Sequence, residues 1–295
     1  MDDLTKRNKI FVNGTKGFIG NALSEELLSL NRSVIKLDRN RSFNEQVEDS
    51  QHNREIENRI LVLCDWKNVY RERDLTEAQV ENAMRWESLG KSAVQHGFTR
   101  IVALGSQAEI GTNQEGVSSH VSFQPRNAYG HAKLQAFNSL QRAVEGTDTQ
   151  LVWARLFSVY GPGMSQTSLI ISVIASLVQG CEIELSEGKQ KWNYLYVKDC
   201  VNALISILET RNVESFYNVA SATAHEVRKV TLCIANEIGN RELLKFGAKP
   251  YAIDEVFDMS PDISNLVKTG WREIVDLESG LKSTITHFRE GVAKN

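Results

Sequence analysis

The chain has 295 residues, 41% apolar and 24% charged, as in an ordinary globular protein with one large α/β domain or two unequal ones. Its net charge of −3 excludes a general attraction to nucleic acid or to an anionic membrane surface. The charged N-terminus and the shortness of the most apolar run, residues 169–178, predict neither a signal peptide nor a membrane span, and therefore a cytoplasmic protein. The four cysteines are scattered, without paired spacing or a histidine at ligand spacing, so we expect reduced thiols and no metal site.

Strand-like and helix-like segments alternate through the first part of the chain. The strand-like segments are short, continuous and rich in valine, isoleucine and leucine, as in strands that are covered on both faces. They lie at residues 9–13, 33–38, 59–64, 99–104 and 150–157. The helix-like segments lie at residues 18–30, 75–96 and 128–145. This alternation predicts an α/β fold with a doubly wound parallel sheet of Rossmann type, which binds ligands at the carboxyl ends of its strands.

Two regions depart from the alternation. Residues 40–58 are polar, and we expect a loop with a short helix there. After Gly161-Pro162-Gly163 the pattern becomes mixed. The helices expected in this part lie at residues 166–179, 198–210, 225–238, 262–266 and 277–289, and the strands at residues 181–186, 194–197 and 216–219. We therefore expect residues 1–160 to form a dinucleotide-binding domain. Residues 161–295 would form mainly a smaller mixed α/β substrate lobe, with some chain returning to the sheet.

Three glycines with a spacing of three residues separate the first strand from the first helix. Gly14 allows a sharp turn off the strand, Gly17 allows backbone amides to approach a pyrophosphate, and Gly20 allows the helix to pack closely on the sheet. The dipole and free N–H groups of the new helix favour phosphate oxygens. The loop therefore predicts dinucleotide binding rather than a purely structural turn. The residues expected to hold the cofactor here are Gly14, Lys16, Gly17, Phe18, Ile19 and Gly20.

The end of the second strand bears on the choice of cofactor. Asp38 follows Gly20 by eighteen residues, where a carboxylate accepts hydrogen bonds from the adenosine ribose and repels a 2′-phosphate. Lys16, Arg39 and Arg41 favour the opposite choice, because each is able to pair with that phosphate. The cofactor is expected to be NAD or NADP, with NAD slightly favoured because Asp38 opposes the phosphate directly.

A serine, a tyrosine and a lysine follow in an order that suits proton transfer. Ser106 lies just beyond a predicted core strand, and Tyr129 and Lys133 lie one turn apart on one face of a predicted helix. An unperturbed tyrosine has a pKa of about 10. A nearby ammonium favours the phenolate, so Tyr129 is expected to exchange a proton near neutral pH. Ser106 would hydrogen-bond the reacting oxygen, and Lys133 would also hold the nicotinamide ribose.

In these motifs the chain resembles the extended short-chain dehydrogenase/reductases, in particular the nucleotide-sugar epimerase, dehydratase and reductase group. The resemblance covers nearly the whole chain and rests on the glycine loop, on Ser106, Tyr129 and Lys133, and on further segments at residues 155–163, 194–199 and 216–219. It implies NAD(P)-dependent hydride transfer on a nucleoside-diphosphate sugar. It also implies a homodimer built on the helices at 75–96 and 128–145, although the apolar residues there would equally pack on the sheet.

The segment Gly105-Ser106-Gln107-Ala108-Glu109 is similar to that of sugar 4-ketoreductases and 4-epimerases of surface-polysaccharide pathways. The 4,6-dehydratases of the family have an Asp-Glu pair where this chain has Gln107 and Ala108, so dehydration is not expected. The resemblance therefore implies reduction of a nucleoside-diphosphate 4-keto-6-deoxyhexose at C4 for polysaccharide biosynthesis. The alternatives are a 4-epimerase that retains its NAD and a non-enzymatic NAD(P) sensor.

The chain departs from the family pattern where the substrate is bound. Ser158 stands where the family often has an asparagine, and Trp192 and Ala252 stand where arginines often hold the substrate diphosphate. Lys191 is one of several lysines that would replace these charges, or it is a solvated surface residue. We expect Ser158, Trp192 and Lys191 to contact the substrate, with Trp192 either stacking on a base or sugar or closing a small core.

Overall fold

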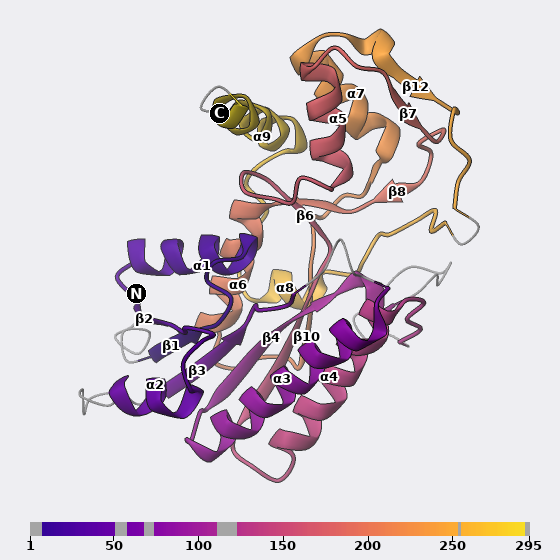
Figure 1. Cartoon of the computed structure of the whole chain (residues 1–295). Coiled ribbons are helices and arrows are strands. Elements are labelled where there is room, and N and C mark those ends of the chain that lie inside the picture. Colours follow the sequence, from indigo (N-terminus) through magenta and orange to yellow (C-terminus); the bar gives the residue numbers. More distant parts are fainter. Residues whose placement is uncertain (1–7, 51–57, 68–73, 111–122, 253–254, 293–295) are drawn as a thin grey trace.

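The computed structural model describes residues 8–50, 58–67, 74–110, 123–252 and 255–292. Its centre is a six-stranded parallel sheet with the strand order β10-β5-β4-β3-β1-β2 (Figure 1). The strands are β1 Asn8–Val12, β2 Ser33–Lys36, β3 Asn58–Leu63, β4 Arg100–Ser106, β5 Gln150–Leu156 and β10 Phe216–Val219. The predicted Rossmann-type α/β fold is therefore confirmed.

Helices cover both faces of this sheet (Figure 1). On one face α1 (Phe18–Ser29) packs against α6 (Val197–Glu209), and on the other α3 (Thr76–Gln95) packs against α4 (Ala128–Val144). The coverage explains the continuous apolar strands, because side chains on both sides of β3 and β4 are buried.

The sheet ends at β2 in the part of the chain that the structure describes. The polar stretch that follows contains the short helix α2 (Phe43–Asp49), as expected for residues 40–58, although residues 51–57 lie outside the described residues. Gln46 of α2 accepts the N–H of Asp38 at 2.7 Å and donates to the Asp38 carbonyl at 3.0 Å. This helix therefore fixes the end of β2, where the cofactor is expected.

The upper part of the molecule in Figure 1 has its own apolar core. Its elements are α5 Leu169–Val178, β7 Ile183–Leu185, β8 Lys191–Trp192, β11 His225–Glu226, α7 Val227–Ile238, η4 Arg241–Leu243, β12 Leu244–Phe246 and α9 Leu277–Val292. Apolar side chains of α5, α7 and α9 meet in this core, because each helix buries one face. The strands are short and pair in twos, β7 with β12 and β8 with β11.

The chain crosses between the two parts more than once. A parallel pair, β6 (Ser158–Tyr160) with β9 (Tyr194–Tyr196), lies at the junction, after which α6 and β10 pack onto the large sheet. Leu266 of α8 (Ser264–Lys268) also belongs to the lower core. The division into domains at residue 160 stays a prediction, while the contacts show that later segments complete the sheet.

Several helices begin later than the sequence pattern predicts, among them α8, which begins at Ser264 rather than at residue 262. The helix expected from residue 166 begins at Leu169, because the Ser168 hydroxyl accepts the N–H of Ile171 at 3.3 Å and caps it. The helix expected from residue 225 begins at Val227, because His225 and Glu226 form a strand with β8. No helix within the described ranges is long and apolar enough to cross a membrane.

Candidate active site

The glycine loop turns tightly between β1 and α1. Gly14 has φ +69°, and a Cβ added there would lie 2.7 Å from the backbone nitrogen of Asp65. A Cβ at Gly20 would lie 2.3 Å from the Gly14 carbonyl oxygen. Gly17 donates its N–H to that same oxygen at 2.9 Å and begins α1 without a side-chain cap or an acidic residue in the first turn. The amides at the start of α1 therefore fit an anionic pyrophosphate.

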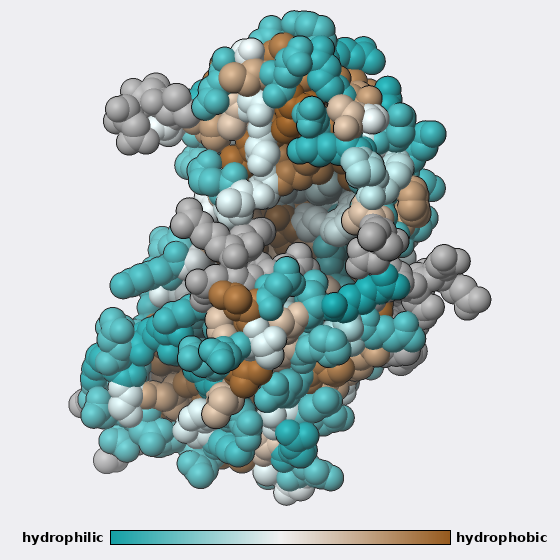
Figure 2. All heavy atoms as spheres, turned by 45° about the vertical axis from the view of Figure 1, so that its right-hand side comes forward, coloured by the Kyte–Doolittle hydropathy of each residue, from teal (hydrophilic) through white to brown (hydrophobic). Residues whose placement is uncertain are grey.

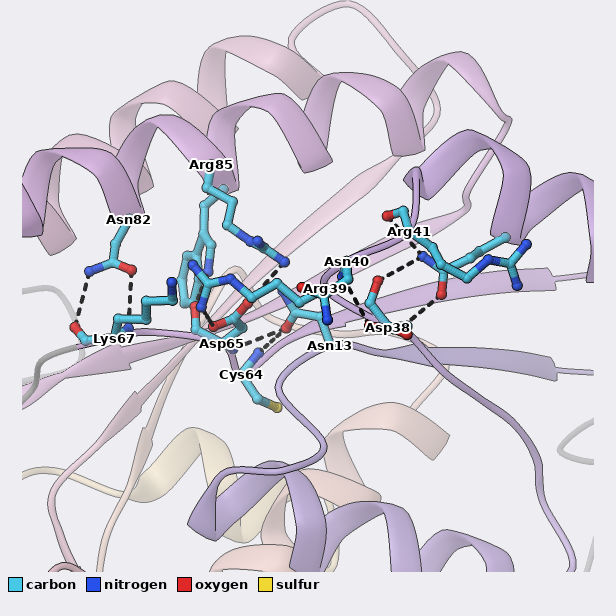
Figure 3. A network of polar contacts seen from close by, with 12 residues as sticks. Asn13, Asp38, Arg39, Asn40, Arg41, Cys64, Asp65, Lys67, Asn82 and Arg85 are labelled. Atoms are coloured by element: carbon cyan, nitrogen blue, oxygen red, sulfur yellow. Dashed lines mark hydrogen bonds and ion pairs between the residues drawn. The ribbon is translucent and has the colours of Figure 1, made fainter.

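Polar side chains meet at the carboxyl ends of β1, β2 and β3 (Figure 3). Asn13 accepts the N–H groups of Cys64 and Asp65 at 2.6 and 3.0 Å, which ties the end of β1 to the end of β3. The amide nitrogen of the Asn13 side chain is buried and has no hydrogen-bond partner among the described residues. A buried donor without a partner is rare, so this nitrogen fits a ligand acceptor beside the loop.

Asp65 holds two arginines in the same network (Figure 3). Its carboxylate lies 3.2 Å from Arg39 and 3.0 Å from Arg85 of α3. The Asp38 carboxylate accepts the N–H of Asn40 at 2.9 Å, while Lys16 is exposed on the loop. Asp38, expected to bind the ribose, and Arg39, expected to bind a 2′-phosphate, are thus neighbours. The Arg39 side chain is already ion-paired with Asp65.

The three candidate catalytic residues lie around the end of β4. Ser106 ends that strand, and its hydroxyl accepts the N–H of Ala108 at 3.2 Å at the start of the short helix η3 (Gln107–Glu109). Tyr129 and Lys133 lie in the first two turns of α4 and are 7% and 3% exposed. The Lys133 ammonium donates to the Leu104 carbonyl of β4 at 2.7 Å and lies 5.9 Å from the centre of the Tyr129 ring. The fold therefore brings the predicted tyrosine and lysine together beside the strand that carries Ser106.

These residues share one edge of the sheet with the glycine loop and the ends of β2 and β3. Parallel strands present their carboxyl ends at the same edge, which is where open α/β sheets bind ligands. Figure 2 shows the molecule hollowed between its lower and upper parts, with apolar side chains visible in the hollow. Residues 10–220, which include the glycine loop, Ser106, Tyr129 and Lys133, match the model of the NAD dependent epimerase/dehydratase family. The chain belongs to that family.

The NAD dependent epimerase/dehydratase family consists of enzymes that use NAD(P), which confirms the resemblance seen in the motifs. Among curated relatives, UDP-glucuronic acid decarboxylase 1 of Xenopus tropicalis is 27% identical over 62% of this chain, and the match spans 44% of that protein. CDP-abequose synthase of Salmonella typhimurium is 22% identical over 94% of this chain and 97% of that protein. The fold is similar to that of UDP-glucose 4-epimerase from Thermotoga maritima, at a TM-score of 0.83, 20% identity, 97% of this chain and 99% of that chain.

Two tryptophans surround the buried lysine, and the sequence motifs of the family do not point to them. The Lys133 ammonium lies 3.8 Å from the centre of the Trp66 ring and 4.0 Å from that of Trp86. Burial lowers the pKa of Lys133 to about 7, while the carboxylate of Glu109 opposes the lowering. Trp66 follows β3 and Trp86 lies in α3, and no short sequence spacing links either indole to Lys133.

The buried ion pair of Glu109 and Arg155 holds the backbone of Ser106 in place. The Glu109 carboxylate accepts the N–H of Ser106, the indole N–H of Trp153 at 2.9 Å and the Nε–H of Arg155 at 3.3 Å. Glu109 and Arg155 are 0% and 1% exposed, and burial raises the pKa of Glu109 and lowers that of Arg155. Arg155 also donates to the Asn218 side chain at 3.3 Å. The strand-end turn that presents Ser106 is therefore fixed by groups from β5 and β10.

The three residues expected to contact the substrate lie in two separate parts of the structure. Ser158 lies near the candidate catalytic residues, because its hydroxyl accepts from the Gln107 side chain at 3.3 Å. Trp192 and Lys191 belong to β8 in the upper lobe, where Trp192 pairs with His225 of β11 and Lys191 donates its backbone N–H to the Phe257 carbonyl at 2.9 Å. Trp192 is half-buried against the upper core and Lys191 is exposed. The substrate roles of all three stay predictions.

Proposed function

We propose that the protein is an NAD(P)-dependent nucleotide-sugar oxidoreductase that reduces a nucleoside-diphosphate 4-keto-6-deoxyhexose at C4 for surface-polysaccharide biosynthesis. The observation that carries this proposal is the buried Lys133 ammonium, which lies beside the Tyr129 ring near the end of β4, the strand that carries Ser106. This arrangement suits proton transfer to an oxygen whose carbon receives a hydride, as at a carbinol or ketone.

When bound, NAD(P)H supplies the hydride. The residues that would hold the cofactor are the glycine loop, Asp38 or Arg39, and Lys133. Ser106 would hydrogen-bond the C4 oxygen of the sugar and hold it near Tyr129. Tyr129 would donate its phenolic proton to that oxygen as the carbonyl becomes an alcohol, and the ammonium of Lys133 would stabilise the phenolate left behind.

The three residues that follow Ser106 argue against dehydration. Gln107 and Ala108 occupy the positions where the family's 4,6-dehydratases have an acidic pair. Glu109 is next in the chain, but it is fully buried and already accepts from Ser106, Trp153 and Arg155. Glu109 is therefore unsuited to removing or donating a substrate proton, which leaves chemistry at a single carbon.

The relatives and the upper lobe support the proposed substrate class. The similarity to CDP-abequose synthase extends over nearly the whole of both chains and supports 4-keto reduction of an activated sugar. Ser158 would contact the sugar because it joins Gln107 beside the candidate catalytic residues, while Trp192 and Lys191 would contact the nucleotide. Because Trp192 and Ala252 replace the usual arginines, lysines such as Lys191 would carry the charge for the diphosphate.

The test is Tyr129→Phe, assayed by the loss of reduced-nicotinamide absorbance with UDP-, CDP- and dTDP-linked 4-keto-6-deoxyhexoses. We expect turnover to fall by about 100-fold or more while binding of NAD(P)H is retained, because only the transferable proton is removed. Tyr217→Phe is the matched control, since the Tyr217 hydroxyl accepts from the backbone of Glu214 at the start of β10. Retention of most activity by Tyr129→Phe would refute the proposed mechanism.

A 4-epimerase with retained NAD is the second candidate, supported by the similar fold of the UDP-glucose 4-epimerase. A reductase consumes one reduced cofactor for each turnover, whereas an epimerase returns its hydride. Native mass spectrometry of the purified protein would therefore separate the two. Tightly held NAD together with conversion of a UDP-hexose, without net cofactor consumption, would favour epimerisation.

A further inference from the structure

The side chain of Lys133 ends in a corner formed by two indole rings. Its ammonium lies 3.8 Å from the ring centre of Trp66 and 4.0 Å from that of Trp86. The two rings meet edge to face, with centroids 4.9 Å apart and planes at 87°. A cation over the face of tryptophan is attracted by the ring's negative face, and the attraction is stronger where water is excluded. With Lys133 only 3% exposed, the corner is such a place.

Each ring is fixed by its own N–H group. Trp66 donates to the side chain of Gln79 at 2.8 Å, and Trp86 donates to the Asp65 carbonyl at 2.7 Å. Gln79 and Trp86 are both fully buried in α3. The hydrogen bonds that hold the corner therefore come from α3 and from the chain just after β3.

The charged and titratable groups that face Lys133 come from three elements and are already engaged. Glu109 of η3 is bound to Arg155, and Asp65 beyond β3 is bound to Arg39 and Arg85. The half-buried Cys64 carries a neutral thiol, because desolvation raises its pKa to about 12. Tyr129, on the same helix, completes the set. Among the described residues, the nearest partners of the ammonium are thus the Trp66 and Trp86 rings and the Leu104 carbonyl.

We propose that Trp66 and Trp86 are positioning residues, which hold the Lys133 ammonium in its charged form and in place beside Tyr129 through cation–π contacts. Trp66 also meets the Tyr129 ring edge to face, with ring centroids 6.0 Å apart and planes at 87°, so that one indole contacts the side chains of both Tyr129 and Lys133. The proposal rests on the function proposed for Tyr129 and Lys133. In this proposal, two aromatic rings offset the desolvation cost of a buried cation, a role that a carboxylate more often has.

The test follows the protonation of Lys133 directly. The NMR signal of the Lys133 side-chain nitrogen, assigned with Lys133→Met, is titrated with pH in the full chain containing labelled lysine. In Trp66→Leu we expect the midpoint to fall by roughly one pH unit, because the cation loses one ring. Trp66→Phe restores a weaker ring and should recover part of the shift. An unchanged midpoint in a folded Trp66→Leu protein would overturn the proposal.

Two further variants separate this effect from general damage. Trp271→Leu also removes a buried indole bonded to a backbone carbonyl, that of Asp199 at 3.1 Å, and should leave the Lys133 midpoint unchanged. If Trp66→Leu does not fold, Trp66→Phe decides, and a midpoint equal to wild type then refutes the proposal. The titration needs no substrate. A protein that is inactive on every sugar tested would refute the proposed function, and the titration would still test the role of Trp66.

Discussion

Lys133 is a buried lysine whose pKa lies near neutral pH. Burial lowers the pKa of Lys133 from 10.5 to about 7. Between these two values the unfolded chain binds more protons than the folded chain, so this group makes the free energy of unfolding rise with pH. The destabilisation is fully present below about pH 7 and is relieved as pH rises toward about 10.

Lys133→Met should therefore be more stable than wild type at about pH 6, with the difference narrowing as pH rises. The pH-dependent part is at most about 5 kcal/mol, from 1.36 kcal/mol for each pKa unit. Urea unfolding of both proteins across this range measures it. A difference that does not vary with pH would show that Lys133 titrates alike in the folded and unfolded states.

The pair of Glu109 and Arg155 predicts a second effect at the scale of single residues. Glu109→Gln leaves the guanidinium of Arg155 buried without a charge partner, so we expect a loss of about 3–5 kcal/mol of unfolding free energy. The double variant Glu109→Gln/Arg155→Met should recover part of this loss. Equal losses in the single and double variants would contradict a charge-based cause.

Residues of the candidate site differ in how far the sequence alone points to them. The proximity of Tyr129 and Lys133 was predictable because one helical turn fixes their relation, and the position of Ser106 because it follows a strand-like segment. Trp66, Trp86 and Glu109 were not, because their contacts with Lys133 or Arg155 join separate elements. No short-range spacing records that an indole of α3 faces a lysine of α4.

At the scale of elements, the glycine loop makes the sharpest prediction. Gly20→Ala places a Cβ 2.3 Å from the Gly14 carbonyl, so that α1 must move away from the loop. We expect a loss of about 1–3 kcal/mol in stability and weaker NAD binding. Gly291→Ala in α9 is the matched control, because a Cβ there meets no described atom within 4 Å. Calorimetry of unfolding and of NAD binding measures both effects, and equal behaviour of the two variants would contradict this account of the loop.

The elements of the large sheet could be predicted more fully than those of the upper lobe. Strands such as β3 and β4 are buried on both faces and read as continuous apolar runs. The pairs β8–β11 and β7–β12 consist of strands of two or three residues. Such short pairings depend on contacts distant in sequence, and their residues carry no distinctive period.

At the scale of the whole molecule, the homodimer stays a prediction. Of the apolar residues of α3, which corresponds to the helix expected at residues 75–96, Ala83 and Trp86 are buried within the chain, whereas Met84 is 60% exposed. Ala83 and Trp86 therefore pack inside the chain, and sedimentation would measure the state of association.

The sheet itself predicts the behaviour of a fragment. Residues 1–160 lack β10, which pairs with β5, and α6, which packs on α1. We expect this fragment to remain unfolded or aggregated, as measured by circular dichroism and light scattering, because the apolar side chains of α6 complete the lower core. A soluble, cooperatively unfolding fragment would contradict this, and a fragment ending after residue 219 is the informative comparison.

The late return of β10 has a consequence during translation. When the ribosome has released β5, the hydrogen-bonding groups along one side of that strand have no partner until residues 216–219 emerge. An unpaired strand edge readily joins other chains. The nascent chain is therefore most exposed to chaperones, and to association with its neighbours, while the upper lobe is being synthesised.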